Sequence, residues 1–168
     1  AALVPANLVL ATGTTLGYVG AGETSARGFT LSSGATLEAA GTGALTLSSA
    51  AKIAFANSTA TRSLTLDGAS VAANSFGADL SVGGTLDADK IDLLVKNGVG
   101  TWIIANGATL KSTATLDVNA GLLGLSAGVL PASGSVVLAT GTTLRFESGN
   151  TEDLSGRIHL DNGASATL

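Results

Sequence analysis

Three aspartates, Asp87, Asp89 and Asp92, lie close together in the sequence and form the densest group of carboxylates in the chain. Side chains of this kind can bind Ca²⁺ or form the acidic face of a β-helical polysaccharide lyase. Calcium prefers about six to eight oxygen ligands in a defined loop, and the sequence lacks the EF-hand pattern. We therefore interpret the group as a solvated turn between two strands, with cation binding as the open alternative.

His159 is the single histidine, and the chain contains no cysteine. This composition excludes metal sites with several histidines, thiolate zinc sites, iron–sulfur clusters, disulfides and a cysteine nucleophile. His159 lies between Ile158 and Leu160 in an alternating apolar pattern, so we expect its side chain to point outward. We predict no catalytic, cofactor-binding or metal-binding residue, and no cofactor.

Several short glycine and threonine patterns resemble ligand-binding motifs without completing them. Phosphate-binding loops need a third glycine and a helix directly after it; neither accompanies the G-x-G pairs, which we interpret as turns. Ice-binding β-helices need one T-x-T triplet in every coil, whereas the triplets here occur irregularly. The pairs are Gly20/Gly22, Gly41/Gly43 and Gly98/Gly100, and the triplets are Thr12–Thr14, Thr113–Thr115 and Thr140–Thr142.

Arg27 and Arg62 stand at equivalent positions of two similar segments, Thr24–Leu31 and Thr59–Leu66. We expect both arginines to cover the edge of a coil or to pair with a nearby carboxylate. Trp102 is the single tryptophan, and we expect it to pack in the core or at an edge rather than to stack on a glycan.

The chain carries little charge for its hydropathy. Charged residues make up 12%, against roughly 25% in soluble domains, and the mean hydropathy is +0.46. The net charge of −4 leaves no basic surface for nucleic acid. A membrane-spanning helix needs about 20 mostly apolar residues, and the strongest apolar window, Leu122–Leu130, is short and contains two glycines. We therefore predict neither nucleic-acid binding nor direct membrane insertion.

Internal repeats dominate the sequence. The octapeptide VLATGTTL occurs at Val9–Leu16 and again, without change, at Val137–Leu144 near the other end of the chain. A shorter theme, Gly-x-Thr-Leu or Gly-Ala-x-Leu, recurs along the chain. Successive leucines of this theme are commonly separated by roughly 20–24 residues, a period typical of solenoids.

The stretches between these themes alternate apolar and polar residues and end at Gly, Asn, Asp or Ser, as short strands closed by turns do. No window shows a sustained helical period. Several strands in each unit of roughly 20–24 residues predict an all-β fold, a parallel β-helix of about seven to eight coils that spans residues 1–168 as a single segment. The stretches are Ala44–Ser48, Ser63–Asp67, Asp79–Val82, Ile91–Val95 and Ser135–Ala139.

Residues 94–125 resemble the passenger-associated transport repeat of bacterial autotransporters. Leu94-Val-Lys-Asn-Gly-Val-Gly-Thr-Trp-Ile-Ile104 is similar to the pattern L-x-K-x-G-x-G-T-[LW]-x-L. Thr115-Leu-Asp-Val-Asn-Ala-Gly-Leu-Leu-Gly-Leu125 resembles the T-x-V-x-x-G-x-L segment that follows it. The signature positions are occupied by Lys96, Gly98, Gly100, Thr101, Trp102, Val118, Gly121 and Leu123. The segment between Ala105 and Thr115 departs from the repeat, since it carries the chain's own coil motif instead.

The resemblance implies a right-handed parallel β-helix in the passenger of an autotransporter adhesin, displayed on the bacterial cell surface, where it contributes to virulence. The implied function is non-enzymatic: a rod that presents binding regions and aids folding of the passenger during secretion. The implied partners are a host-cell surface protein or glycan, neighbouring coils of the same chain, and a C-terminal outer-membrane barrel in the parent protein. The sequence starts without Met or a basic signal region, so we expect a segment excised from a longer chain.

Two alternatives stay open. A β-helical carbohydrate-active enzyme of the pectin lyase type would need several Asp, Arg or Lys side chains on one solvent face, and the sequence offers only the group at 87–92. A modular domain that binds host glycan or protein through its side loops would need an exposed aromatic patch, and aromatic residues make up only 4% of the chain.

Overall fold

The computed structural model describes residues 8–48, 52–56, 61–77, 79–82, 90–105, 108 and 110–161. Within these ranges the regular structure is entirely β-strand, which confirms the all-β prediction. None of the described segments forms a helix long and apolar enough to cross a membrane. All of the strand stretches predicted from alternation contain a strand of the structure.

The strands form three sheets, in which every pair of neighbours is parallel. Sheet A contains β1 (Val9–Leu10), β4 (Phe29–Leu31), β7 (Lys52–Phe55) and β10 (Asp79–Val82). Sheet B contains β2 (Thr14–Tyr18), β5 (Gly34–Ala39), β8 (Ser63–Asp67), β11 (Ile91–Lys96), β13 (Leu110–Val118), β15 (Val136–Leu138) and β17 (Ile158–Leu160). Sheet C contains β3 (Glu23–Ser25), β6 (Leu45–Leu47), β9 (Asn74–Phe76), β12 (Thr101–Ile104), β14 (Leu122–Leu125) and β16 (Thr143–Phe146).

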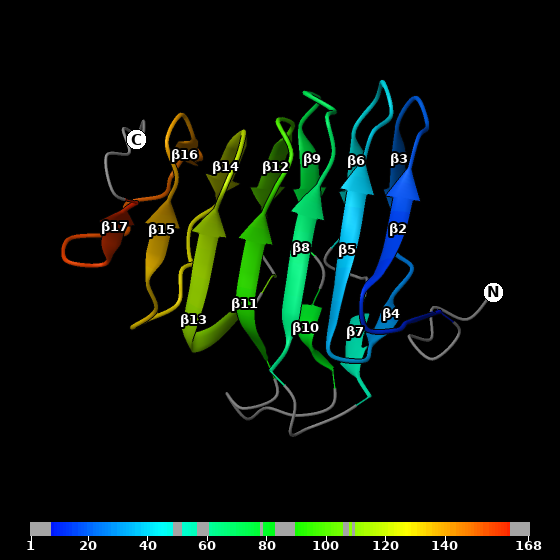
Figure 1. Cartoon of the computed structure of the whole chain (residues 1–168), viewed down its shortest axis with the longest axis horizontal. Coiled ribbons are helices and arrows are strands. Elements are labelled where there is room, and N and C mark those ends of the chain that lie inside the picture. The colour runs from blue at the N-terminus through cyan, green and yellow to red at the C-terminus, as the bar shows by residue number, and fades with distance from the viewer. Residues whose placement is uncertain are drawn as a thin grey trace.

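The chain visits the sheets in turn and so winds into a parallel β-helix. In Figure 1 the strands of sheet B run upward at the front, the chain crosses over the top to sheet C behind, and successive coils advance from right to left. This course makes the helix right-handed. The predicted fold class is confirmed, and within the described residues the seven strands of sheet B mark seven successive coils.

Most coils have the expected length, and two are longer. Leu16 pairs with Leu37 and Leu94 pairs with Leu116, and both steps match the spacing of the sequence theme. In the middle of the rod, however, Thr36 pairs with Thr65 and Leu64 pairs with Leu94, and these steps are clearly longer. The parallel pairing within sheet B continues across both longer steps.

The cross-section changes along the axis. Up to Val82 a coil contributes to all three sheets, whereas the described residues after Val82 add strands only to sheets B and C. Beyond Val82 the core also includes buried side chains from segments between strands and from the long strand β13. These are Ala108, Ala114, Val129 and Leu154.

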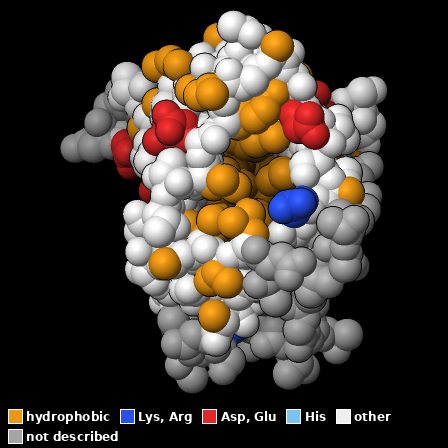
Figure 2. Space-filling view, turned by 90° about the vertical axis from the view of Figure 1, so that its right-hand side faces the viewer, with side chains coloured by type: hydrophobic (Ala, Val, Ile, Leu, Met, Phe, Trp, Pro, Cys, Tyr) orange, Lys and Arg blue, Asp and Glu red, His pale blue; other side chains and the backbone are white. Residues whose placement is uncertain are grey.

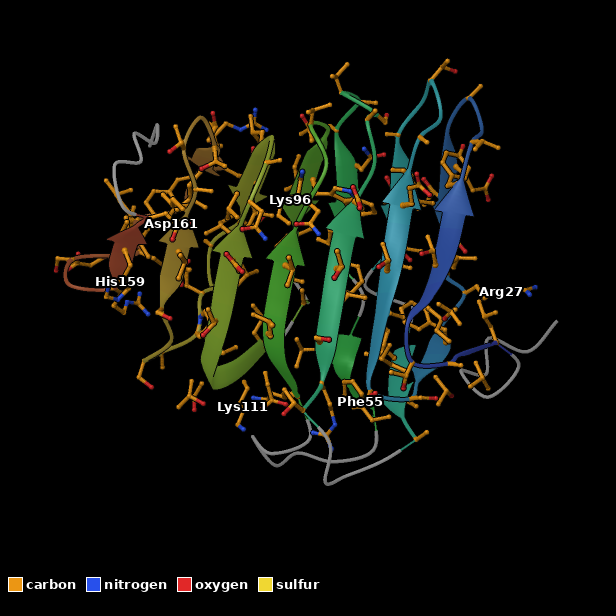
Figure 3. The ribbon with its side chains drawn as sticks, viewed as in Figure 1. Arg27, Phe55, Lys96, Lys111, His159 and Asp161 are labelled. Carbon is orange, nitrogen blue, oxygen red and sulfur yellow. The ribbon has the colours of Figure 1, made fainter. Side chains whose placement is uncertain are left out.

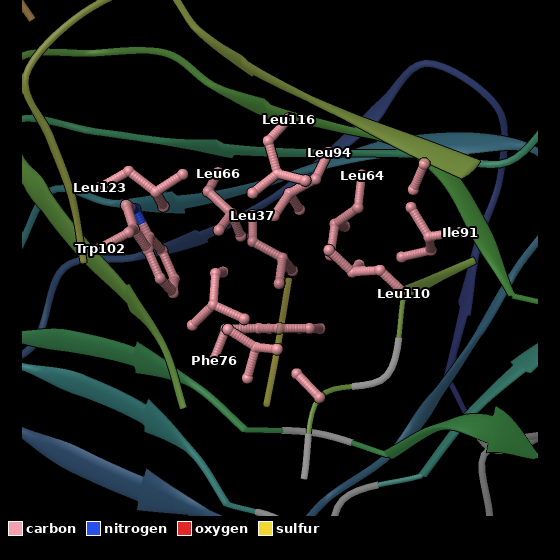
Figure 4. Close-up of a cluster of buried hydrophobic side chains, with 14 of the residues drawn as sticks. Leu37, Leu64, Leu66, Phe76, Ile91, Leu94, Trp102, Leu110, Leu116 and Leu123 are labelled. Atoms are coloured by element: carbon pink, nitrogen blue, oxygen red, sulfur yellow. The ribbon is translucent and has the colours of Figure 1, made fainter. Parts of the chain in front are cut away.

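The core is a set of ladders in which equivalent inward positions of successive coils stack. Ala35, Leu64, Leu94, Leu116 and Val136 follow one another along sheet B, and all are at most 5% exposed. Figure 4 shows leucines of this ladder in one buried cluster with Phe76 and Trp102, which come from sheet C. Burying each such side chain stabilises the fold by about 1.5–3 kcal/mol. Because the ladder runs through successive coils, this stabilisation is distributed along the rod.

The repeated octapeptide forms the same turn twice, on different faces of the helix. At both copies the Thr hydroxyl donates to the Ala carbonyl three positions earlier at 2.7 Å (Thr14 to Ala11, Thr142 to Ala139), and the intervening glycine has φ of 77° or 76°. Yet the first copy joins sheet A to sheet B, and the second joins sheet B to sheet C. The local sequence therefore specifies a corner without specifying which one.

Gly98 is a corner where a side chain cannot fit. Its φ is 68°, in the left-handed region that favours glycine, and a Cβ there would overlap the backbone nitrogen and oxygen of Gly68 in the preceding coil. Gly128 has a similar φ of 78°, but nothing lies within 4 Å of the position its Cβ would take.

We expect Gly98→Ala to destabilise the chain more than Gly128→Ala. Both variants incur the left-handed penalty of about 1–2 kcal/mol, and only Gly98→Ala adds about 1–3 kcal/mol from overlap with the neighbouring backbone. Urea unfolding followed by Trp102 fluorescence measures the difference. Equal losses in the two variants would show that close stacking of the corners is not what requires glycine.

Candidate functional site

The structure places one of the three clustered aspartates in an ion pair. Asp87 and Asp89 lie outside the described residues. Asp92 accepts hydrogen bonds from Nζ of Lys111 at 2.6 Å and from the backbone amide of Arg62 at 2.9 Å. Burial alone would raise the pKa of Asp92, but these hydrogen bonds outweigh it and hold the pKa below its ordinary value. Within the described ranges, no three potential metal ligands gather.

The two arginines have different surroundings. Arg62 is 2% exposed, and its guanidinium lies 4.7 Å from the ring centroid of Phe55, so it is buried against an aromatic ring. Arg27 is exposed at the N-terminal end of the rod, from which it projects in Figure 3. His159 is exposed at the opposite end, which confirms its outward orientation.

Trp102 lies in the core, as predicted. It is fully buried and stacks between Asn74 and Leu123 in sheet C. Its indole Nε1 donates to the backbone carbonyl of Asp67 at 2.9 Å. The pair Gly98/Gly100 forms the turn that leads into this strand, which confirms that pair as a turn.

Lys96 is the most unusual side chain of the described core. It pairs with Leu66 on one side and with Val118 on the other, and so occupies an inward position in a ladder of aliphatic residues. Its exposed fraction is 0%. A charged group seldom occupies such a position unless hydrogen bonds compensate for the lost water.

The ammonium group of Lys96 is fully provided with acceptors. Nζ donates to the carbonyl oxygens of Asn97 at 2.6 Å, Gly98 at 2.8 Å and Ala120 at 3.0 Å. An ammonium has three N–H donors, so each one meets a carbonyl. Because Asn97 and Gly98 belong to one coil and Ala120 to the next, the side chain joins two corners from inside.

Burial lowers the pKa of Lys96 to about 8, and the nearby carboxylate of Asp67 opposes this shift. A lysine with a lowered pKa is a candidate nucleophile. Here, however, the amine has no exposed surface and its hydrogens are directed at backbone carbonyls. The geometry therefore supports a structural role.

Lys96 and two more buried side chains, Trp102 and Asn74, form what we call the corner cluster. The amide of Asn74 donates to the carbonyls of Ser70, Ala72 and Thr101 and accepts from the amide of Leu45. The three side chains thus satisfy backbone groups where the chain bends from sheet B to sheet C. Sequence reasoning placed Lys96 in the repeat signature but missed its interior position, which the alternation Leu94–Lys96 already indicates.

Among the described residues, no strand covers the outer edge of the first coil. A hollow of about 200 Å³ is lined by Leu16, Tyr18, Phe29, Leu37 and Leu47, with Glu23 and Arg27 also contributing. Figure 2 shows hydrophobic side chains at the bottom of this hollow and charged groups around it. It exposes the interior of the first coil.

The sequence is similar to that of a known bacterial adhesin. Over 118 residues, 70% of this chain, the sequence is 33% identical to the protein named Adhesin BmaC autotransporter from Brucella suis biovar 1 (strain 1330). The chain is similar to an autotransporter adhesin. This confirms the resemblance to an autotransporter passenger that residues 94–125 indicate.

The chain spans 3% of the length of that adhesin, so the similarity concerns one segment of a much longer protein. No family model matches the chain. No solved structure matches it either.

We expect Lys96→Met to lower the free energy of unfolding by about 1–3 kcal/mol at pH 7. Methionine fills a similar volume but leaves three carbonyl oxygens without their ammonium donor. Lys111→Met is the matched control, because it removes a partly exposed ion pair that contributes about 0–1 kcal/mol. Urea unfolding of both variants makes the comparison, and a Lys96→Met protein as stable as Lys111→Met would contradict the structural role.

The stability loss caused by Lys96→Met should also depend on pH. The pKa of about 8 in the folded chain lies below the ordinary value of 10.5, so between these values the unfolded chain holds a proton that the folded chain has released. Stability from this group therefore rises with pH through the window. The loss caused by Lys96→Met should grow between pH 8 and pH 10.5, and a constant loss would show that Lys96 titrates normally.

Proposed function

We propose that this chain is a non-enzymatic structural and adhesive segment of an autotransporter passenger displayed on the bacterial surface. Its β-helix forms a rod that presents binding regions to a host-cell surface protein or glycan. The observation that carries the proposal is the 33% identity to an autotransporter adhesin over 70% of the chain.

The geometry supports a rod more than a catalyst. Six steps between the seven strands of sheet B, at about 4.8 Å each, give roughly 30 Å of regular length. Several polar side chains form hydrogen bonds inside the fold. Lys96 and Asn74 donate to backbone carbonyls, and the carboxylate of Asp92 accepts from Lys111 and from the backbone amide of Arg62. A lyase-like enzyme would need such groups to converge on an open face.

We expect beads coated with the chain to attach to cultured host cells several-fold more than beads coated with its Leu66→Asp variant. Leu66 is fully buried, and a carboxylate there disrupts the ladder, so the variant reports on unfolded protein of nearly the same composition. Excess soluble chain should compete. Equal attachment of both proteins, or turnover of polyuronate by the purified chain, would overturn the proposal.

The same proposal includes a role in folding: C-terminal coils form first and offer an edge to the coils before them. The steps from β11 to β17 are short, from Leu94 through Leu116 and Val136 to Ile158. Contacts that are closer in sequence form faster, whereas the two longer steps lie further toward the N-terminus.

Two matched leucine truncations test this order. Leu123 in β14 and Leu37 in β5 are both at most 1% exposed, so each change to alanine should cost about 2–5 kcal/mol. We expect Leu123→Ala mainly to slow refolding and Leu37→Ala mainly to speed unfolding, measured by stopped-flow fluorescence of Trp102. The opposite pattern would place the nucleus in the N-terminal coils.

A further inference from the structure

Asn97 and Gly98 form an Asn-Gly pair at a corner between sheets B and C, after β11 and before β12. Two more pairs of this kind, Asn106–Gly107 and Asn162–Gly163, lie outside the described residues. In such a pair the backbone nitrogen of the glycine can attack the side-chain carbonyl carbon of the asparagine, because glycine has no side chain to hinder the approach. The surroundings of Asn97 determine whether this reaction has the groups it needs.

The attacking nitrogen is available. Within the described part of the chain, the backbone amide of Gly98 donates no hydrogen bond, whereas the amides of Asn97 and Gly100 on either side both donate to the preceding coil. Gly98 is also partly exposed, so water can take up the proton that its nitrogen loses on attack. One coil further on, the corresponding amide of Ala120 is occupied, because it donates to the carbonyl of Lys96 at 3.4 Å.

The carbonyl that receives the attack is activated. Its oxygen, Oδ1 of Asn97, accepts a hydrogen bond from Nδ2 of Asn119 at 3.1 Å. During the attack this oxygen gains negative charge, and a donor that is already directed at it stabilises that charge. The neighbouring coil therefore supplies a group that favours the reaction.

Asn119 provides a comparison within the same fold. It occupies the position of Asn97 one coil further on, since Lys96 pairs with Val118, and it is the more exposed of the two asparagines. Exposure alone would therefore favour reaction at Asn119. However, the next residue is Ala120, whose methyl group hinders the approach and whose amide already donates a hydrogen bond. Asn119 thus lacks the nucleophile that Asn97 has.

We propose that Asn97 is a site of spontaneous deamidation in the folded chain, assisted by Asn119. The nitrogen of Gly98 forms a bond to Cγ of Asn97. The side-chain nitrogen leaves as ammonia with the proton that the Gly98 amide gives up, and a cyclic succinimide remains. Water then opens the ring. Opening at Cγ gives aspartate, and opening at the backbone carbonyl carbon gives isoaspartate, whose main chain runs through the former side chain.

Both products change this corner of the rod. Aspartate at position 97 adds a negative charge close to Asp67 of the preceding coil. Isoaspartate lengthens the main chain by a methylene group and turns the backbone carbonyl of Asn97, to which Nζ of Lys96 donates at 2.6 Å, into a carboxylate. Because Gly98 stacks closely on Gly68, the longer main chain disturbs the contact between the two coils.

The experiment incubates the folded chain at neutral and at mildly alkaline pH and locates the mass increase of deamidation by peptide mapping. Fragment-ion spectra distinguish Asn97 from Asn106. We expect modification at Asn97 and none at Asn119, at a rate that rises with pH because the attacking nitrogen must lose its proton. Asn97→Gln should stay unmodified at this position, since glutamine would need a larger ring. An intact Asn97 in the folded chain, under conditions that modify it in the urea-unfolded chain, would overturn the proposal.

Asn119→Ala tests the contribution of the fold. Asn119 is exposed, and thermal unfolding verifies that the variant is folded. Loss of the donor to Oδ1 should slow deamidation of Asn97 several-fold in the folded chain, whereas the variant and the natural chain should react equally fast in urea. The matched control is Thr140→Ala, at an exposed corner position one coil further on, which should leave the rate unchanged. Equal rates in the folded Asn119→Ala variant and the folded natural chain contradict the assistance by Asn119.

Discussion

Hydrogen bonding of each coil to the next is the constraint on which the whole structure depends. No two strands of one coil pair with each other, so the backbone groups of its strands bond mainly to the coils before and after it. Stacking in register also aligns equivalent side chains, and this alignment produces the aliphatic ladders of the core. Both the winding of the chain and the ladders of the core follow from this repeated contact.

The corners are where this constraint is hardest to meet. Some backbone carbonyls of the turns between sheets B and C accept from backbone amides of the next coil, as those of Gly68 and Ser70 do from Gly100 and Thr101. The corner cluster adds donors from side chains: Lys96 to three carbonyls, Asn74 to three and Trp102 to one. The signature Lys and Trp of the repeat can thus be understood as structural elements of a solenoid, consistent with a chain that is similar to an adhesin segment.

Much of this could be predicted because solenoids repeat locally. Alternation in Ser63–Asp67 and Ile91–Val95 indicated strands, and the spacing of the Gly-x-Thr-Leu theme indicated coils. The two longer steps, which end at β8 and at β11, were not predictable in this way, since the alternation within each strand does not depend on the number of residues between strands. The interior position of Lys96 was also missed, because a lysine is ordinarily assigned to a solvent face.

The repeated octapeptide separates what the sequence determined from what tertiary structure decided. VLATGTTL by itself determines a corner: a glycine with positive φ and a threonine whose hydroxyl bonds the alanine carbonyl three positions earlier, in both copies. Tertiary structure decided that one copy turns from sheet A to sheet B and the other from sheet B to sheet C. The physical reason is that a turn is made by bonds within a few residues, whereas a strand's sheet is set by the coil on which it stacks.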